Sequence, residues 1–360
     1  MKIFQPIGVS FSKELRSLVV TKRVRVSLLE VAQNAGVSPA TVSRVFNNSA
    51  PVSDNIRTKV LASAEALGYE IPSSHSQNGN SIRTVAVVVA DLLNPFFPEL
   101  IRGVDIEARQ DNTSILLYDT AEDTQPEEHL MKMVSTRSLD GLIVAGSRIA
   151  LDDLVNYCKR YAIPLVMINR SINCYGDVAC IRVDFEKAVY HAARHLLSLG
   201  HTRIGYLAGP EATEMSLARR KGLEDALGEV NLPLYPELMS SGFPNVAGGF
   251  QAMSSLLSLP ESQRPTAVQT YNDLMAFGAL KAIYAHRLQV PGDISVVGFD
   301  DIALAAHANP PLTTVEQPKT YMGSLAMRML REMMDRKIGL GGGFTLLESR
   351  LVVRETTGPV

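Results

Sequence analysis

From residue 84 onward, short apolar runs alternate with segments of helical periodicity, and this alternation is the feature that most constrains the fold. The candidate strands are 84–91, 114–119, 141–145, 164–169, 178–184, 203–209, 267–271, 294–299 and 313–317. Near-continuous runs of Val, Ile and Leu separated by helices are typical of parallel sheets that helices cover on both faces. Because nine strands are too many for one sheet of common size, we expect two α/β subdomains.

The composition is that of an ordinary globular chain. Of its 360 residues, 46% are hydrophobic and 20% are charged, and this length accommodates a small module beside a large domain. The longest apolar runs, such as 85–90, are far shorter than the roughly 20 residues that span a bilayer, so we expect no membrane partner. Cys158, Cys174 and Cys180 form no C-x-x-C pair, and we expect reduced, buried thiols in a cytoplasmic protein.

The charge is distributed unevenly along the chain. Residues 1–83 hold ten Lys and Arg against five Asp and Glu, an excess of +5, so the remainder must carry −7 to give the net charge of −2. A basic end on an acidic body fits phosphate binding at that end. Residues 1–26 are expected to be a poorly ordered extension rather than a secretory signal, because Lys13, Glu14 and Arg16 interrupt their apolar residues.

Residues 27–68 carry the start and stop signals of three short helices. Serines that can cap a helix precede the segments, and glycines that suit a left-handed residue follow the first and third; these residues are Ser27, Ser38, Ser53, Gly36 and Gly68. In the second helix, Pro39 lies at the first helical position, where its missing N–H has no consequence. Ala40, Arg44 and Asn47 share the face opposite its apolar residues.

Two helices joined by a tight turn, the second with small polar residues and one Arg outside, fit the DNA major groove. The alternative is a plain three-helix bundle with a solvated polar face. The sequence VSPATVSRVFN over residues 37–47 closely resembles the DNA-binding head of the LacI/GalR family of bacterial repressors. The resemblance implies base contacts from Pro39, Ala40 and Arg44, and phosphate contacts from Ser38, Thr41, Ser43 and Asn47. It also implies a homodimer on a pseudo-palindromic, double-stranded DNA operator.

Polar and aromatic residues follow the predicted strands at their carboxyl ends, where open parallel sheets bind ligands. These residues are Asp91, Asn94, Phe96, Ser147, Asn169, Arg170, Arg219, Phe243, Asn272, Asp273, Asp300 and Asp301. Amides, carboxylates and arginines around aromatic faces suit a polyhydroxylated or carboxylated small molecule. Each residue taken alone is better explained as a helix cap or turn residue, and Asp301 is an example.

The family resemblance extends over residues 27–356 through segments such as DGLIVAGS, RRKGL and SVVGFDDIALAAHANPPLTTVEQP. It implies the fold of the type I periplasmic binding proteins, with two subdomains linked by three crossovers. Positions that match effector contacts are Asn94, Ser147, Asn169, Arg219, Asn272 and Asp300; Asp91, Phe96, Arg170 and Phe243 complete our candidate effector site. The segment 97–110 matches part of the dimer interface of the family.

These observations predict an all-α helix-turn-helix head and a two-subdomain α/β effector domain. The expected parts are an extension at 1–26, the head at 27–70, a linker at 71–83 and an effector domain at 84–356. The N-subdomain is expected over about 84–181 and 318–339, and the C-subdomain over about 182–317 and 344–356.

The function expected is a transcriptional repressor controlled by a small-molecule effector, a sugar or sugar derivative, without cofactor, metal or catalytic residues. A secreted solute-binding protein would need a signal peptide and would lack the helix-turn-helix. An α/β enzyme is the other alternative, but the chain holds no G-x-G-x-x-G after a strand, no P-loop, no G-x-S-x-G and no H-E-x-x-H.

The linker departs from the family pattern, in which a helix inserts a leucine into the minor groove. Gly79 falls near the position of that leucine, and Gly costs ~1 kcal/mol in a helix relative to Ala. We therefore predict a linker without an intercalating helix, and DNA that is bent less than such repressors usually bend it. A circular-permutation assay measures the bend. A sharp central kink that disappears in Ile82→Ala would instead make Ile82 the inserted residue.

Overall fold

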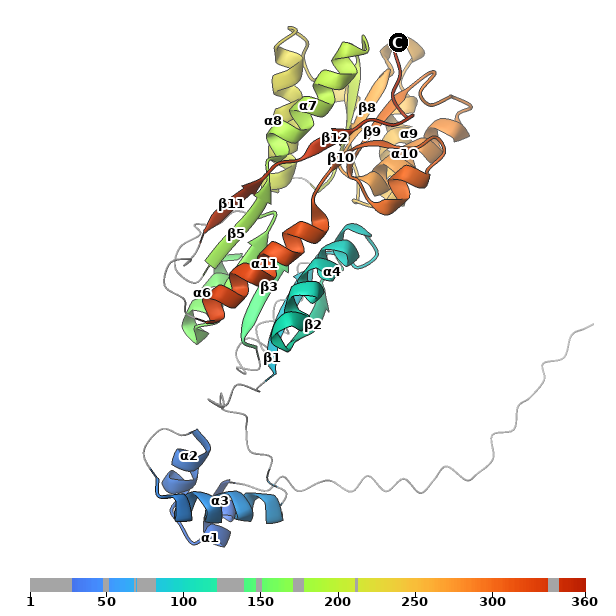
Figure 1. Ribbon diagram of the computed structural model, residues 1–360. Helices are drawn as coiled ribbons and strands as arrows, with labels where there is room; N and C mark the ends of the chain where they lie inside the picture. Colours follow the sequence, from blue (N-terminus) through green and yellow to red (C-terminus); the bar gives the residue numbers. More distant parts are fainter. Residues whose placement is uncertain are drawn as a thin grey trace, which may run out of the picture. The chain divides into compact units, whose positions relative to one another are not determined.

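The computed structural model of the protein describes residues 28–47, 52–67, 69, 82–121, 139–146, 151–170, 178–210, 213–335 and 343–360. The chain divides into two compact units, residues 1–81 and 82–360, which are described separately below (Figure 1). The extension at 1–26, Ser147 and almost all of the linker at 71–83 lie outside the described residues, so the predictions for them remain predictions.

Unit 1 contains the three predicted helices, α1 (Leu28–Ala35), α2 (Pro39–Asn47) and α3 (Asp54–Leu67). Their inner faces form one small core, whose buried members are Val31, Ala32, Val42, Val45, Val60 and Ala64. Gly36 has φ +67° after α1, as its predicted role requires. Ser38 Oγ accepts a hydrogen bond from the Thr41 amide at 3.1 Å and so caps α2 as expected.

Unit 2 is built on two six-stranded sheets. Sheet A has the order β11-β5-β4-β3-β1-β2 and sheet B the order β12-β10-β9-β8-β6-β7. Every neighbouring pair is parallel except β10 and β12. The bounds in sheet A are β1 Arg83–Val89, β2 Thr113–Asp119, β3 Gly141–Ala145, β4 Leu165–Ile168, β5 Val178–Val183 and β11 Phe344–Leu347. Those in sheet B are β6 Ile204–Ala208, β7 Met239–Ser241, β8 Ala267–Thr270, β9 Ser295–Asp300, β10 Thr313–Glu316 and β12 Arg350–Val352.

Helices cover both faces of each sheet, as the near-continuous apolar strands predict. Their bounds are α4 Phe96–Ala108, α6 Leu151–Tyr161, α7 Phe185–Ser198, α8 Glu214–Gly228, α9 Val246–Leu257, α10 Asp273–Ala285 and α11 Lys319–Met334. On sheet A, α4 and α11 lie side by side on one face and α6 packs on the other. On sheet B, α7 and α8 cover one face, and α9 and α10 the other. Sheet A with its helices is called the N-subdomain and sheet B with its helices the C-subdomain.

The chain passes between the sheets three times, which confirms the predicted two-sheet architecture. It leaves sheet A between β5 and α7, returns between β10 and α11, and leaves again between β11 and β12. All nine predicted strands are present within one or two residues of their expected bounds. The sequence missed β7, β11 and β12, which lie at sheet edges, have only three or four residues and are partly exposed.

The prediction for the cysteines is wrong at one position. Cys158 is a buried free thiol, and burial raises its pKa to about 12, which makes it unreactive. Cys180, in contrast, is disulfide-bonded. Spacing along the chain could not reveal this bond, because disulfide formation depends on the distance between cysteines in space.

The contact between α4 and α11 depends on glycine. A Cβ at Gly323 would overlap the Leu100 carbonyl, and one at Gly103 would overlap the Thr320 carbonyl. We predict that Gly323→Ala lowers the free energy of unfolding by ~1–3 kcal/mol, because backbone atoms must move apart. Urea unfolding measures the change. Gly228→Ala, at a helical position with open space among the described residues, is the control and should be neutral or stabilising. Equal losses in the two variants would contradict the close-packing argument.

Candidate DNA-binding helix and effector site

The outer face of α2 is polar and open. Ser38, Pro39, Ala40 and Arg44 are exposed, whereas Val42 and Val45 on the opposite face are buried. The rings of Phe46 and Tyr69 stack with centroids 5.5 Å apart and fix the end of the helix against the chain that follows α3.

Among the predicted phosphate-binding residues, Thr41 and Ser43 are partly exposed. The hydroxyls of Ser38 and Thr41 are 2.8 Å apart, which orders both side chains at the start of the helix. Asn47 ends α2, and its side chain lies outside the described part of the chain.

Arg219 is the central cation of the predicted effector site. It lies on α8, is 3% exposed, and its guanidinium carbon lies 4.8, 4.3 and 4.0 Å from the ring centroids of Phe185, Tyr271 and Phe299. One Nη donates to the Tyr271 carbonyl, while the buried Nε finds no hydrogen-bond partner among the described residues. Because buried N–H groups are almost always satisfied, an additional hydrogen-bond acceptor is expected at this atom.

Asp300 is the corresponding buried carboxylate, at the end of β9. It is 5% exposed, and its backbone has φ +116°, a region that residues other than glycine rarely occupy. Gln317 Nε2 donates to Asp300 Oδ1 at 2.7 Å. Burial raises the pKa of Asp300 to about 6, and the positive charges of Arg219 and Lys319 oppose that shift.

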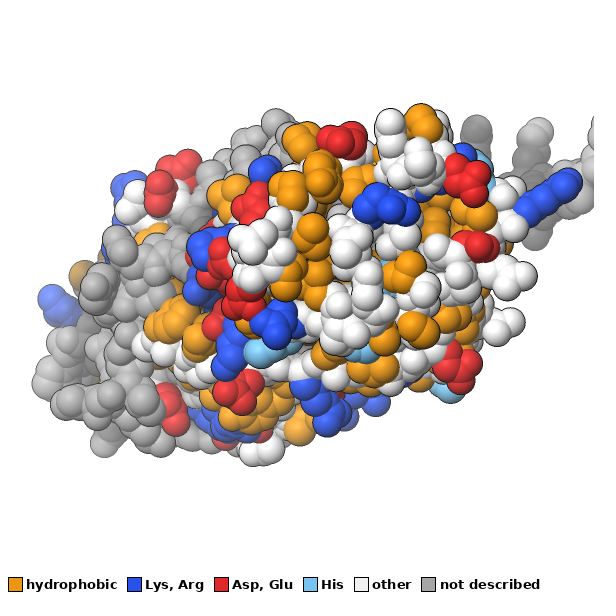
Figure 2. All heavy atoms as spheres, turned by 90° about the horizontal axis from the view of Figure 1, so that it is seen from above, with side chains coloured by type: hydrophobic (Ala, Val, Ile, Leu, Met, Phe, Trp, Pro, Cys, Tyr) orange, Lys and Arg blue, Asp and Glu red, His pale blue; other side chains and the backbone are white. Residues whose placement is uncertain are grey.

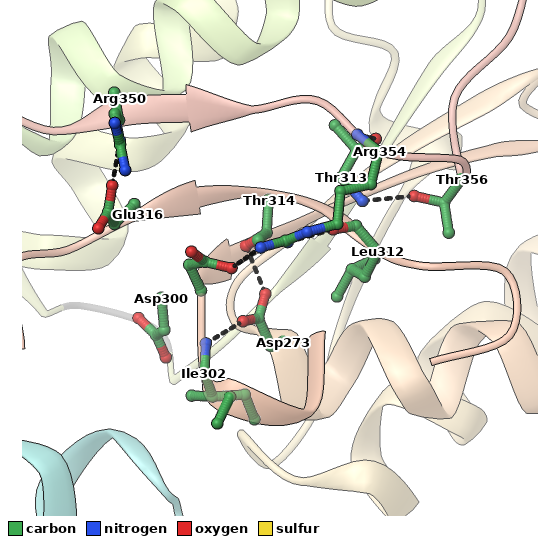
Figure 3. Close-up of polar contacts among 12 residues, drawn as sticks. Asp273, Asp300, Ile302, Leu312, Thr313, Thr314, Glu316, Arg350, Arg354 and Thr356 are labelled. Atoms are coloured by element: carbon green, nitrogen blue, oxygen red, sulfur yellow. Dashed lines mark hydrogen bonds and ion pairs between the residues drawn. The ribbon is translucent and has the colours of Figure 1, made fainter. Parts of the chain in front are cut away.

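Asp273 has a structural role at the start of α10. Its carboxylate is fully buried and accepts hydrogen bonds from Thr314 Oγ1 at 2.5 Å and from the Ile302 amide at 2.9 Å. Burial and the neighbouring Asp300 raise its pKa. Figure 3 shows Asp273 among its donors and the carboxylate of Asp300 apart from that group. Asp301 pairs with Arg354 at 2.7 Å and has φ +50°, which fits its interpretation as a turn residue.

Asn169 and Arg170 follow the carboxyl end of β4 in the N-subdomain. Asn169 Nδ2 donates to Gln317 Oε1 at 3.0 Å, so one glutamine joins Asn169 to Asp300. Burial lowers the pKa of Arg170, and the negative charge of Glu214 opposes that effect.

Other candidates are engaged in local hydrogen bonds. Asn272 caps α10, where its Oδ1 accepts from the Met275 amide at 2.9 Å, and Asn94 Oδ1 accepts from the Phe96 amide at 3.0 Å. Asp91 Oδ1 likewise accepts from the Leu93 amide at 2.8 Å. These contacts are the cap and turn roles that we named for each residue taken alone.

The structure brings together only part of the predicted effector set. Arg219 and Asp300 interact electrostatically, and Asn169 joins them through Gln317. Phe96 is buried in an edge-on pair with Phe97, whereas Phe243 is 47% exposed. Gln317 and Lys319 were not predicted, although Gln317 ends the predicted strand at 313–317 and Lys319 lies two residues beyond it. Inspecting the carboxyl end of that strand as well would have found them.

Neither a metal-binding cluster nor a membrane span is found among the described residues. No group of three or more His, Cys, Asp or Glu that could hold a metal ion occurs among them. None of their helices is long and apolar enough to cross a membrane. Figure 2 looks onto the end of unit 2 where α7 and α8 lie, and acidic and basic side chains are interspersed there. The described side chains on that face therefore form no continuous basic surface.

Comparison with known proteins places both units in one family. Residues 27–72 match "Bacterial regulatory proteins, lacI family", and residues 193–357 match "Periplasmic binding protein-like domain". The HTH-type transcriptional repressor CytR of Escherichia coli (strain K12) is 35% identical over 332 residues, which cover 92% of this chain and 96% of that protein.

Two solved structures extend the comparison. The transcriptional regulator CelR–cellobiose complex has a TM-score of 0.69 at 29% identity, covering 92% of this chain and 100% of that chain. A LacI family transcriptional regulator from Enterococcus faecium with bound ribose has a TM-score of 0.69 at 28% identity, covering 77% and 100%.

A helix-turn-helix head joined to a two-sheet periplasmic-binding-like domain defines a DNA-binding transcriptional regulator. The chain belongs to the LacI family of bacterial regulatory proteins.

The raised pKa of Asp300 gives a prediction for stability. The folded state keeps this carboxyl protonated up to about pH 6, whereas the unfolded chain releases the proton near pH 4. Between these values the folded state binds more protons, so this residue lowers stability as pH rises and its full penalty is present above pH 6. We predict that Asp300→Asn, which keeps an acceptor for Gln317, raises the unfolding free energy at pH 8 by about 1–3 kcal/mol.

The gain should shrink as the pH approaches 4, and urea unfolding at pH 8, 6 and 4.5 follows it. Asp301→Asn is the control, because that change removes an ion pair to Arg354 and should give no gain. A gain from Asp300→Asn that is independent of pH would show that burial of the charge is not its cause.

Proposed function

We propose that the protein is a homodimeric repressor that reads a pseudo-palindromic operator through α2 and changes its operator affinity when a sugar or nucleoside binds between its subdomains. The outer face of α4, which corresponds to the predicted dimer segment, is proposed as part of the dimer interface. The protein is proposed to act in the cytoplasm, where its DNA lies, and to catalyse no reaction.

The buried pair of Arg219 and Asp300 carries the proposal for the effector. The Arg219 Nε is a charged donor in need of an acceptor, and Asp300 has a second carboxylate oxygen beyond the one that Gln317 contacts. A buried donor and a buried acceptor that interact electrostatically suit vicinal hydroxyl groups, which both donate and accept. The cellobiose and ribose in the two similar structures support the same class of ligand.

We propose further contacts to the effector and to DNA from the residues that the sequence predicts. The effector residues are Asp91, Asn94, Phe96, Ser147, Asn169, Arg170, Phe243 and Asn272, and the DNA residues are Ser38, Pro39, Ala40, Thr41, Ser43 and Asn47, with Arg44 as the main base reader. Pro39 has no N–H to donate, so base recognition rests more on Ala40 and Arg44.

Arg44→Ala tests the DNA half of the proposal. The operator is first selected from random duplex DNA, and titrations then compare it with single-base variants. We predict that the variant loses discrimination of ~1–3 kcal/mol at one base pair per half-site, the value of a bidentate Arg–guanine contact. Lys59→Ala, which removes an exposed cation on α3, serves as the control and should leave base preference unchanged. An equal loss by Arg44→Ala on operator and random DNA would assign Arg44 to phosphate.

Arg219→Met tests the effector half. Thermal unfolding is measured with ribose, cellobiose, cytidine and adenosine, since a ligand at 100 times its dissociation constant adds ~2.7 kcal/mol. We predict that a stabilising compound loses its effect in Arg219→Met, because charge-assisted hydrogen bonds worth ~1.5–3 kcal/mol each are removed. Methionine still fills the space among the three rings. Arg220→Ala, at the neighbouring exposed residue that pairs with Glu224, should respond as the unmodified protein does. An unchanged response in Arg219→Met would place the effector elsewhere.

A further inference from the structure

Three buried polar side chains form a continuous chain between the two subdomains. Asn169 Nδ2 donates to Gln317 Oε1 at 3.0 Å, and Gln317 Nε2 donates to Asp300 Oδ1 at 2.7 Å. Their exposures are 5%, 2% and 5%, so solvent does not compete for these bonds. Asn169 belongs to the N-subdomain, Asp300 to the C-subdomain, and Gln317 to the crossover between β10 and α11. We call these three residues the crossover relay.

All hydrogen bonds of the crossover relay have the same direction. The Val183 amide, at the end of β5, donates to Asn169 Oδ1 at 3.4 Å, Asn169 donates to Gln317, and Gln317 donates to Asp300. Each donor therefore points toward the carboxylate, and hydrogen bonds aligned in this way polarise one another. Because Val183 lies at the crossover from β5 to α7, the relay connects two of the three crossovers to one carboxylate.

Lys319 makes a second bridge between the subdomains at the same place. Its Nζ donates to the carbonyls of Asp300 and Asp301 at 2.8 and 2.7 Å, and lies 3.5 Å from Glu99 Oε2 on α4. Asp300 and Asp301 have φ +116° and +50°, which are unfavourable for residues with side chains. The lysine therefore holds the turn after β9 in the backbone conformation that directs Asp300 toward Gln317.

We propose that Gln317 is the positioning residue that couples the charge on Asp300 to the relative orientation of the two subdomains. The inference rests on the proposed function, since it takes Asp300 to be the effector carboxylate. An effector hydroxyl that donates to Asp300 Oδ2 draws negative charge away from Oδ1. The bond from Gln317 to Oδ1 is then weakened, and with it the connection to Asn169. Binding at Asp300 thus weakens the hydrogen-bonded connection between the subdomains, in addition to the direct contacts proposed between the effector and the N-subdomain.

The first experiment needs no effector. Spin labels are attached at Lys159→Cys on α6 and Gln251→Cys on α9, two exposed positions, one in each subdomain. The labelled full-length protein is mixed with excess unlabelled protein, so that only distances within one protomer are measured. Gln317→Leu removes the amide and keeps the approximate size. We expect one narrow distance distribution in the unmodified protein and a broader one with an additional population in Gln317→Leu.

Gln269→Leu is the matched control. Gln269 is also fully buried, but its Nε2 donates only to the Thr270 and Gly298 carbonyls within the C-subdomain. It should alter stability without altering the distance distribution. An unchanged distribution in Gln317→Leu, or the same change in both variants, would overturn the proposal.

Gln317→Glu provides a second variant if the leucine variant does not fold. It keeps the acceptor for Asn169 and places a carboxyl group against Asp300, among the charges of Arg219, Lys319, Glu99 and Asp273. At pH 8 the two carboxylates repel, so the distance distribution should broaden, whereas at pH 5 a shared proton should restore the narrow one. A role in packing alone would give no such reversal, and a distribution independent of pH would count against the relay.

A final measurement separates this inference from the proposed effector. Ribose and cytidine are titrated into the unmodified protein and into Gln317→Leu, and operator affinity is measured with and without each compound. The relay predicts that Gln317→Leu still binds the compound. The change in operator affinity that the compound causes should, however, be at least about fivefold smaller than in the unmodified protein. Absence of binding to the unmodified protein, with a broadened distribution in Gln317→Leu, would reject the proposed effector class and retain the relay. Binding with full coupling in Gln317→Leu would reject the relay and retain the effector.

Discussion

A carboxylate buried where two sheets meet is the constraint on which the rest of unit 2 depends. Asp300 has almost no access to solvent, and burial alone drives it toward the neutral form. To remain a useful acceptor near neutral pH, the carboxylate needs donors and positive charge nearby. Gln317, Lys319 and Arg219 supply them from a crossover, from the start of α11 and from α8. Two of these three groups, Gln317 and Lys319, therefore also join the subdomains.

The DNA-binding unit meets the opposite requirement. Its proposed DNA-contacting side chains lie on an exposed or partly exposed helix face, so their positions depend mainly on the helix that carries them. The buried Val42 and Val45, the cap at Ser38 and the stack of Phe46 on Tyr69 fix α2. Arg44 is therefore an exposed side chain on a helix whose position is fixed by the core of unit 1.

Much of the fold could be predicted because its central strands are buried on both faces, which makes them continuous apolar runs. The strands β7, β11 and β12 lack this signal, because they have only three or four residues and all of these are partly or fully exposed. The helix caps at Ser38 and Gly36 were visible because specific residues favour these backbone positions.

The site was less predictable than the fold. Asp300 and Asn169 could be proposed from strand ends and Arg219 by resemblance, but the hydrogen bonds that join Asn169 and Asp300 through Gln317 depend on tertiary structure. The rings of Phe185 and Phe299 are apolar residues in apolar segments. No periodicity reveals that they face a guanidinium.

The glycine contacts restrict where a rotation of one subdomain against the other could be absorbed. A Cβ at Gly323 or Gly222 would overlap a backbone carbonyl of the facing helix, and Gly278 meets the Val246 carbonyl in the same way. Helices this close cannot slide past one another without backbone overlap, so each subdomain responds as a rigid body. The three connections between the sheets are then the segments that can absorb rotation. A single buried glutamine on one connection can therefore influence both bodies, because few other contacts have to change with it.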